Sequence, residues 1–152
     1  MNQRMNLGKT SPEAYKAMLD FDNYLSSTEI TPLHQELIRI RASQINGCSY
    51  CIDMHTREAR KIGETEQRIY ALSVWRETPF FTEEERSILA LTEEITMIHQ
   101  HVTDETYNSA KELLGDKYLS QVIMAIIIIN SWNRIGVALK MSPEAVLVKS
   151  ER

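Results

Sequence analysis

Two cysteines and one histidine stand at the spacing of a single helical face. Cys48 and Cys51 are three residues apart, and His55 follows Cys51 by four, so all three side chains would share one side of a helix. The Asn46-Gly47 pair directly before Cys48 indicates that this helix begins there, where unpaired N–H groups and the helix dipole stabilise a thiolate. An imidazole within hydrogen-bond reach helps a thiol to lose its proton near neutral pH. The pattern therefore predicts a reactive cysteine pair within disulfide reach.

One carboxylate on the preceding helix falls on the side that could meet this cysteine pair. Glu36 lies on the helical stripe that also holds Ile40, Ser43 and Gly47. If the two helices pack antiparallel across the turn at Gly47, that stripe faces the cysteines. We expect a half-buried carboxylate in this place to orient His55 or to relay its proton.

Two other interpretations of the same residues remain open. Cysteines at helical spacing can be small core residues, or can lock and release a conformation in a non-catalytic redox sensor or scaffold. Cys48, Cys51 and His55, with Glu36 as the fourth ligand, also provide the atoms that zinc prefers. Structural zinc clusters usually draw their ligands from two separate knuckles, however, and this chain supplies one. Thiol chemistry is therefore favoured over a zinc module.

Helix start and stop signals recur along the whole chain. Cap residues precede apolar positions that repeat with a period near 3.6, and glycine or proline marks the ends of the segments. Thr82 and Glu85 have the spacing of a capping box. No Asn-Gly or Asp-Gly pair is flanked by alternating runs, so no β-hairpin is predicted. The expected helices cover about 12–25, 32–46, 48–63, 65–76, 82–98, 103–115 and 116–140.

The most apolar run, 122–129, is β-branched and could on its own be a buried strand. Apolar character continues to Leu139, which is too long for one strand, and a lone strand would have no partner. We therefore predict a helix buried on most sides, in the core or in an oligomer interface. The polar segment 130–134 interrupts it, either for buried structural bonding or an interface, or to line the pocket of the cysteines. The resulting prediction is one all-α domain over 1–152.

Composition excludes several classes of function. The 152 residues are 43% hydrophobic and 25% charged, as in an ordinary globular domain. The net charge is −4 and no basic stripe occurs, so nucleic-acid binding is not expected. The longest apolar run has eight residues, far short of the roughly 20 that cross a membrane, and no signal-peptide core follows the N-terminus. With only two cysteines and no disulfide framework, we expect a cytoplasmic protein.

The pattern Glu-(x11)-Cys-x-x-Cys-x-x-x-His in an all-helical chain resembles the alkylhydroperoxidase D (AhpD)-like branch of the carboxymuconolactone decarboxylase family. Glu36, Cys48, Cys51 and His55 carry it, and the similarity covers a family core from about 36 to 96. The resemblance implies an all-α bundle of about six to eight helices that assembles into trimers or hexamers. It also implies peroxide reduction by the cysteine pair, with electrons from a dithiol donor such as a lipoyl protein.

By position, the resemblance makes Cys51 the cysteine that attacks peroxide and becomes a sulfenic acid, and Cys48 the one that resolves it. Glu36 and His55 would relay protons. Tyr50 stands where the best-known members carry a second histidine, and a phenol is a poorer proton shuttle than imidazole at neutral pH. The decarboxylase branch lacks the cysteine pair, so lactone decarboxylation is not expected. The chain has no flavin or nicotinamide fingerprint, so we expect no bound cofactor and expect reducing equivalents to arrive through another protein or a small dithiol. Because thiol chemistry is favoured over the zinc interpretation, no bound metal is expected either.

Overall fold

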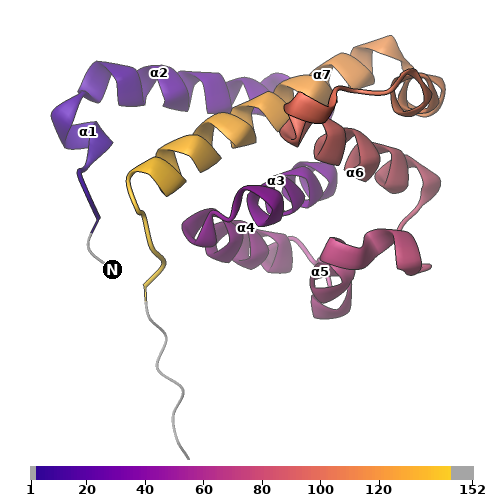
Figure 1. The fold of residues 1–152 in the computed structure, drawn as a ribbon, viewed down its shortest axis with the longest axis horizontal. Helices are drawn as coiled ribbons and strands as arrows, with labels where there is room; N and C mark the ends of the chain where they lie inside the picture. The colour runs from indigo at the N-terminus through magenta and orange to yellow at the C-terminus, as the bar shows by residue number, and fades with distance from the viewer. Residues whose placement is uncertain (1–2, 145–152) are drawn as a thin grey trace, which may run out of the picture.

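The computed structural model describes residues 3–144, and these residues are helical through most of their length, with no strand (Figure 1). Seven α-helices occur among them, so the prediction of an all-α fold with six to eight helices is confirmed. The α-helices and the three 3-10 helices (η) follow one another as α1 (Leu7–Thr10), α2 (Pro12–Asn23), η1 (Tyr24–Ser27), α3 (Pro32–Asn46), α4 (Ser49–Lys61), α5 (Glu66–Ala71), η2 (Leu72–Glu77), α6 (Glu83–Thr96), η3 (Ile98–Gln100) and α7 (Asp104–Ala138).

Hydroxyl side chains begin several helices at the places that the sequence predicts. Thr31, Thr65 and Thr103 each accept a hydrogen bond from the backbone N–H three residues further on. Thr82 and Glu85 form both hydrogen bonds of the predicted capping box. Each cap satisfies an N–H group that the first turn leaves unpaired and typically contributes about 1 kcal/mol. These boundaries are therefore set by local sequence.

The helix predicted over 65–76 is divided. α5 ends at Ala71 and the chain continues as the 3-10 helix η2, with a kink at Val74 (φ −125°, ψ 30°). This turn brings the indole Nε1 of Trp75 to 2.9 Å from the Glu93 carboxylate on α6. A buried indole N–H needs such a partner, so a tertiary contact accounts for a change that helical periodicity does not predict.

Helix α7 carries the most apolar run and is interrupted once. Gly115 has φ 72° and ψ 160°, which glycine adopts without steric cost, so the predicted break between the helices 103–115 and 116–140 is confirmed. The run 122–129 is helical, as its length predicted, with Val122 and Ile126 fully buried and Ile127 exposed. Within residues 3–144, no helix is both long and apolar enough to cross a membrane.

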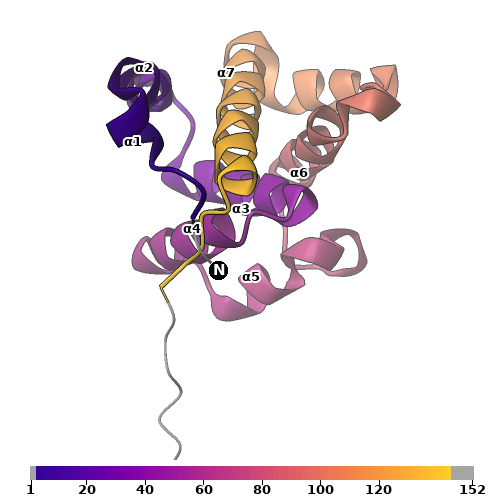
Figure 2. The same ribbon diagram turned by 60° about the vertical axis from the view of Figure 1, so that its left-hand side comes forward.

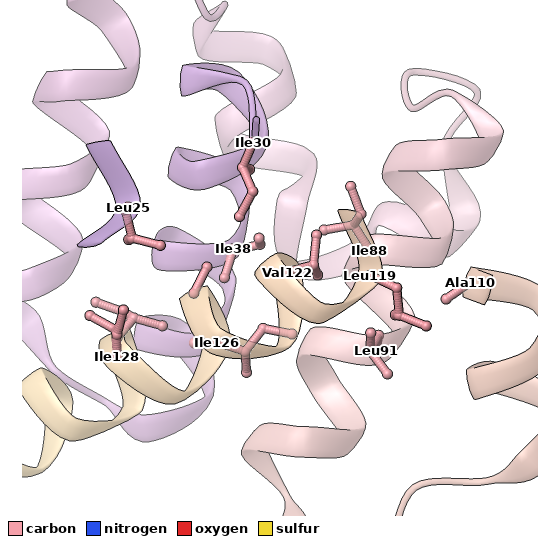
Figure 3. Close-up of a cluster of buried hydrophobic side chains, with 13 residues drawn as sticks. Leu25, Ile30, Ile38, Ile88, Leu91, Ala110, Leu119, Val122, Ile126 and Ile128 are labelled. Atoms are coloured by element: carbon pink, nitrogen blue, oxygen red, sulfur yellow. The ribbon is translucent and has the colours of Figure 1, made fainter. Parts of the chain in front are cut away.

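Two apolar clusters hold the helices together. The larger one lies where α7 packs against α3 and α6 (Figure 3). The smaller one joins the other side of α3 to α4, α5, η2 and α6. Because α3 contributes to both clusters, it is the central element against which α4 and α7 are positioned (Figure 2). The largest fully buried side chains are those of Leu37, Ile38, Ile40, Leu72, Ile88, Leu89, Leu91, Leu119, Val122, Ile126, Ile128 and Ile129.

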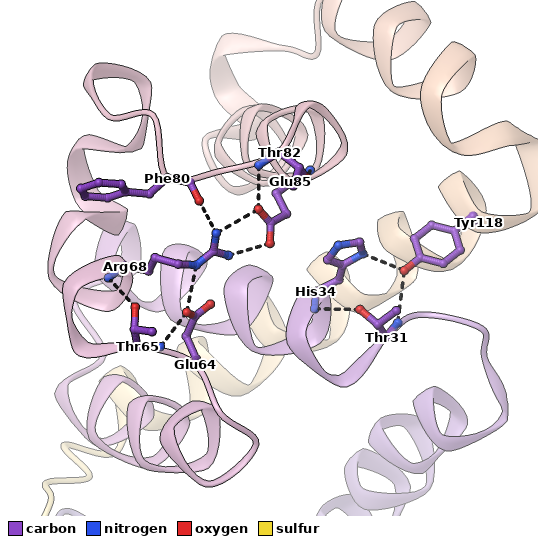
Figure 4. Close-up of polar contacts among 9 residues, drawn as sticks. All are labelled: Thr31, His34, Glu64, Thr65, Arg68, Phe80, Thr82, Glu85 and Tyr118. Atoms are coloured by element: carbon purple, nitrogen blue, oxygen red, sulfur yellow. Dashed lines mark hydrogen bonds and ion pairs between the residues drawn. The ribbon is translucent and has the colours of Figure 1, made fainter.

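Two groups of polar contacts join helices at the side of the bundle that lies away from the cysteines (Figure 4). Arg68 of α5 donates hydrogen bonds to Glu64 at 2.9 Å and to Glu85 of α6 at 2.6 Å. His34 Nδ1 lies 2.8 Å from the Tyr118 hydroxyl and joins the start of α3 to α7. These contacts therefore join α5 to α6 and the start of α3 to α7.

Helices α1 and α2 lie beside the C-terminal part of α7, apart from the rest of the bundle (Figures 1 and 2). Neither has a fully buried side chain, although Tyr15 and Leu19 give α2 an apolar stripe. The N-terminal segment is tied to the end of α7 by Arg4, whose backbone N–H donates to the Leu139 carbonyl at 2.9 Å. The α1–α2 pair therefore forms a wall over α7, with Phe21 as the residue of α2 that packs against the larger apolar cluster.

Candidate active site

The turn between α3 and α4 places both cysteines at the start of α4. Gly47 ends α3 in the left-handed conformation, with φ 67° and ψ 31°, which favours glycine. Cys48 is the N-cap of α4, and its Sγ accepts a hydrogen bond from the Cys51 backbone N–H at 3.3 Å. The predicted position of Cys48 at a helix N-terminus is confirmed, and a helix N-terminus is a place that favours a thiolate over a thiol.

Cys48 and Cys51 are joined by a disulfide, with their Cα atoms 5.3 Å apart. Both residues are buried, with 2% and 3% of their surface exposed. The structure therefore shows the pair in its oxidised form, inside the protein and sheltered from bulk solvent. The predicted disulfide reach of this spacing is confirmed.

Glu36 and His55 meet across the α3–α4 interface. His55 Nδ1 lies 3.0 Å from Glu36 Oε2, and both residues are buried. The other carboxylate oxygen, Oε1, accepts a hydrogen bond from Arg39 at 2.7 Å. Burial by itself raises the pKa of the Glu36 carboxyl, but the hydrogen bonds and charges of His55 and Arg39 hold that pKa below its ordinary value. An ionised Glu36 accepts a hydrogen bond from the Nδ1–H group of His55. The proton of the neutral ring is then on Nδ1, and Nε2 is the nitrogen that can act as a base.

A pocket of about 510 Å³ opens onto Cys51 and His55 between α2, α4 and α7. Cys48 is not among the residues that line it. Tyr50 lies in the wall and takes no part in the hydrogen-bonded pair of Glu36 and His55. Trp132 and Tyr15 both line the pocket and pack edge to face, with ring centroids 5.8 Å apart. A largely apolar pocket that ends at one cysteine sulfur and one imidazole suits a small organic molecule.

Sequence reasoning missed Gly136, the residue of α7 that lies against the disulfide. A Cβ added at Gly136 would lie 2.8 Å from Cys48 Sγ and 3.4 Å from Cys51 Sγ. The absence of a side chain lets the α7 backbone approach both sulfurs. Gly136 is the only glycine in the segment 116–140, and an isolated glycine inside a helical pattern is a signal of close packing that could have indicated it.

We expect Gly136→Ala to shift the cysteine pair toward the dithiol. In the disulfide, Cys48 Sγ cannot rotate away from a new methyl group, whereas a free thiol can. Overpacking of this kind typically costs about 1–3 kcal/mol, equivalent to roughly 5- to 150-fold in the equilibrium with a dithiol buffer. Mass spectrometry of quenched mixtures measures the ratio, and thermal unfolding of the reduced variant is the control for general damage. An unchanged ratio would contradict a close contact between α7 and the sulfurs.

The polar segment 130–134 serves mainly buried structural bonding. Asn46 Nδ2, next to the α3–α4 turn, donates to the side-chain oxygens of Asn130 and Asn133, both at 2.9 Å. Asn133 in turn donates to Ser43 Oγ at 2.9 Å. Of this segment, Trp132 is the residue that lines the pocket of the cysteines. The asparagine network therefore ties the cysteine turn to α7 and helps to set the approach of Gly136.

The zinc interpretation finds no support in the arrangement of side chains. Within the described part of the chain, no three His, Cys, Asp or Glu residues converge in a way that could hold a metal ion. The two sulfurs are bonded to each other, and Nδ1 of His55 is bonded to Glu36. The arrangement instead provides an oxidisable sulfur pair, an oriented imidazole and a pocket.

Comparisons with known proteins identify the family of the chain and relatives of its fold. The model of the carboxymuconolactone decarboxylase family matches residues 12–94. The Bacillus subtilis (strain 168) protein YdfG is 45% identical over 140 residues, 91% of this chain and 95% of YdfG. The solved structure of ATU0492 from Agrobacterium tumefaciens, of unknown function and with a suggested role as the antioxidant defence protein AhpD, has a TM-score of 0.92 at 38% identity over 95% of this chain and 100% of that one.

A more distant structural neighbour of the chain is an enzyme with a different activity. The debrominase Bmp8, solved as a cysteine-to-alanine variant in complex with 2,3,4-tribromopyrrole, has a TM-score of 0.83 at 19% identity, over 91% of this chain and 74% of Bmp8. At this identity the likeness concerns the fold alone. The activity of the present chain must be argued from its own residues.

Proposed function

The chain belongs to the carboxymuconolactone decarboxylase family, in its AhpD-like branch, and we propose that it is a thiol-dependent peroxidase that acts through Cys51 and Cys48. One observation carries the proposal. Cys51 is disulfide-bonded to Cys48 and opens onto a pocket that it shares with a histidine held by a buried carboxylate. Each part of that arrangement has a step to perform.

In the first step the Cys51 thiolate attacks the terminal oxygen of a hydroperoxide. The S–O bond forms as the O–O bond breaks, which yields a sulfenic acid on Cys51 and an alkoxide that takes a proton to leave as the alcohol. His55 is the acid–base group for the proton transfers, with its ring oriented by Glu36. Tyr50 contributes to the pocket wall beside them.

In the second step the Cys48 thiolate attacks the Cys51 sulfur. The disulfide forms and the sulfenic oxygen leaves as water, so one peroxide is reduced and two thiols are oxidised. A dithiol, such as the lipoyl group of a partner protein, then reduces the disulfide and is itself oxidised. A pair that is recycled in this way requires a reducing compartment, so the proposal includes a cytoplasmic location.

A peroxide-consumption assay with dihydrolipoamide as electron donor tests the proposal. We expect the reduced protein to lose two thiols per peroxide and to regain them with the dithiol, and we expect Cys51→Ser to show no turnover. A non-catalytic redox sensor or scaffold would oxidise slowly and would sustain no turnover with excess donor. Slow, stoichiometric oxidation of the unmodified protein would therefore favour that alternative.

We also propose that copies of the chain assemble into a trimer or hexamer. A second pocket of about 530 Å³ lies along α6 and α7, away from the cysteines, and most of its lining is apolar. Ile98, Tyr107 and Ile127 contribute to it and are exposed. Apolar patches of this kind on an isolated chain are typical of protein–protein interfaces.

Light scattering tests the assembly. We expect the mass of a trimer or hexamer of the 17.6 kDa chain, and we expect Ile127→Asp to lower that mass because it places a charge in the apolar groove. Lys117→Asp, at an exposed position of the same helix, is the control and should leave the assembly intact. A monomer mass that does not change with protein concentration would overturn the proposal.

A further inference from the structure

We propose that Arg39 is a positioning residue for the Glu36–His55 pair and that Asp22 of α2 holds it in place, an inference that rests on the proposed function of that pair. Arg39 lies on α3, one turn beyond Glu36, and it does not line the pocket. It acts on the cysteine through Glu36 and His55 rather than by touching a substrate. The sequence pattern did not single out Arg39 or Asp22.

Arg39 and the groups linked to it span three helices. Its NH1 donates to Glu36 Oε1 at 2.7 Å, and its NH2 lies 3.6 Å from Asp22 Oδ1. The opposite oxygen of Glu36 meets His55 Nδ1 at 3.0 Å. The side chains of Arg39 and Glu36 are 17% and 7% exposed, so water competes little for their hydrogen bond, whereas Asp22 is 39% exposed and its ion pair is the weaker of the two. The charged groups therefore form an ordered chain from α2 through α3 to α4.

The hydrogen bond from Arg39 to Oε1 restrains rotation of the Glu36 carboxylate. If Arg39 were absent, Glu36 could rotate or share the proton of His55, because burial favours the neutral acid. The guanidinium is permanently charged and planar, and it can hold two carboxylates at once in fixed directions. Arg39 thereby keeps Glu36 ionised and keeps Oε2 directed at the imidazole.

Both ends of the chain of charged groups face the same pocket. Asp22 and His55 line it from α2 and α4, and the residues that α7 contributes, such as Trp132 and Leu139, carry no charge. From the N-terminal segment, Gln3 and Asn6 are uncharged as well. Of the groups that line the pocket beside Cys51, Asp22, Tyr50 and His55 can titrate, while Arg39 and Glu36 act on Asp22 and His55 from behind the wall. Removal of Arg39 makes the charge of the remaining residues more negative. A more negative surrounding favours the neutral thiol of Cys51 over its thiolate.

The pH dependence of Cys51 alkylation measures this effect without any peroxide. In the Cys48→Ser background, iodoacetamide reports the fraction of Cys51 that is thiolate. We expect Arg39→Gln to move the midpoint of the alkylation rate upward by roughly 0.5 pH units or more, because the groups linked to His55 lose a positive charge that favours the thiolate. Arg39→Lys keeps the charge but not the planar fork, so its midpoint should move upward by less than that of Arg39→Gln.

Arg41→Gln is a matched control. Arg41 lies on the same helix, its side chain is 16% exposed, and its Nε lies 2.7 Å from Glu93. This variant also loses one charge and one part-buried ion pair, yet it leaves the pair of Glu36 and His55 untouched. We expect a similar loss of thermal stability and an unchanged alkylation midpoint.

The possible outcomes decide between the inference and its premise. Equal midpoints for Arg39→Gln and Arg41→Gln would overturn the positioning role. If Arg39→Gln does not fold, a wild-type alkylation midpoint for Arg39→Lys overturns it instead. Absence of peroxide consumption by the unmodified protein would overturn the proposed function, while the alkylation profiles would still show whether Arg39 governs the Glu36–His55 pair.

Discussion

Cys51→Ser is expected to abolish the formation of sulfenic acid with peroxide, whereas Cys48→Ser is expected to form a sulfenic acid that persists. Cys51 opens onto the pocket with His55 one helical turn away, so a peroxide can reach its sulfur beside an acid–base group. Cys48 does not line the pocket, and its sulfur lies between the Cys51 backbone N–H and Gly136. Without Cys48, no second sulfur is available to resolve the intermediate.

Trapping with a sulfenic-acid reagent followed by mass spectrometry measures both variants. The label should appear on Cys51 in Cys48→Ser and on no residue in Cys51→Ser. The opposite assignment has a physical argument too, because Cys48 occupies the N-cap of α4, where a thiolate gains most from the helix dipole. A label on Cys48 in Cys51→Ser, with none on Cys51 in Cys48→Ser, would show that helix polarity outweighs access to the pocket.

Local sequence predicts the helices well because their signals are local. A cap and its N–H partner lie three residues apart, as with Thr82 and Glu85, and the break at Gly115 needs only one residue. The spacing of Cys48 and Cys51 fixes their separation once α4 forms. These features depend on the geometry of one helix, which the sequence specifies directly.

The contacts that complete the site come from distant parts of the chain, and helical periodicity does not predict them. The predicted pairing of Glu36 with His55 requires α3 and α4 to pack antiparallel, and the contact between the two side chains agrees with that packing. Gly136 is far from Cys48 in sequence and reaches it because α7 crosses α3 at an angle set by the whole core. Asp22 meets Arg39 because α2 lies outside the core and over the pocket. Such placements follow from packing, which the sequence pattern does not reveal.

His55→Asn is expected to slow the attack on peroxide by about 10²- to 10⁴-fold, the usual effect of losing a general base. The asparagine amide can still donate to Glu36, so the buried carboxylate keeps a partner and the fold is preserved. Stopped-flow measurement of the first oxidation step, with the reduced protein and no donor, isolates this step from recycling. Thermal unfolding of the variant shows whether the loss of rate has a structural origin.

Tyr50→Phe and Glu36→Gln show how much each neighbour of His55 contributes to the rate of attack on peroxide. Tyr50→Phe removes only a hydroxyl from the pocket wall and should slow the same step far less than His55→Asn. Glu36→Gln keeps the size of the side chain but removes the charge that fixes the Nδ1 proton, so its effect should lie between those of the other two variants. If Tyr50→Phe were as slow as His55→Asn, the phenol would be the proton shuttle, and the hydrogen bond from His55 to Glu36 would serve the fold alone.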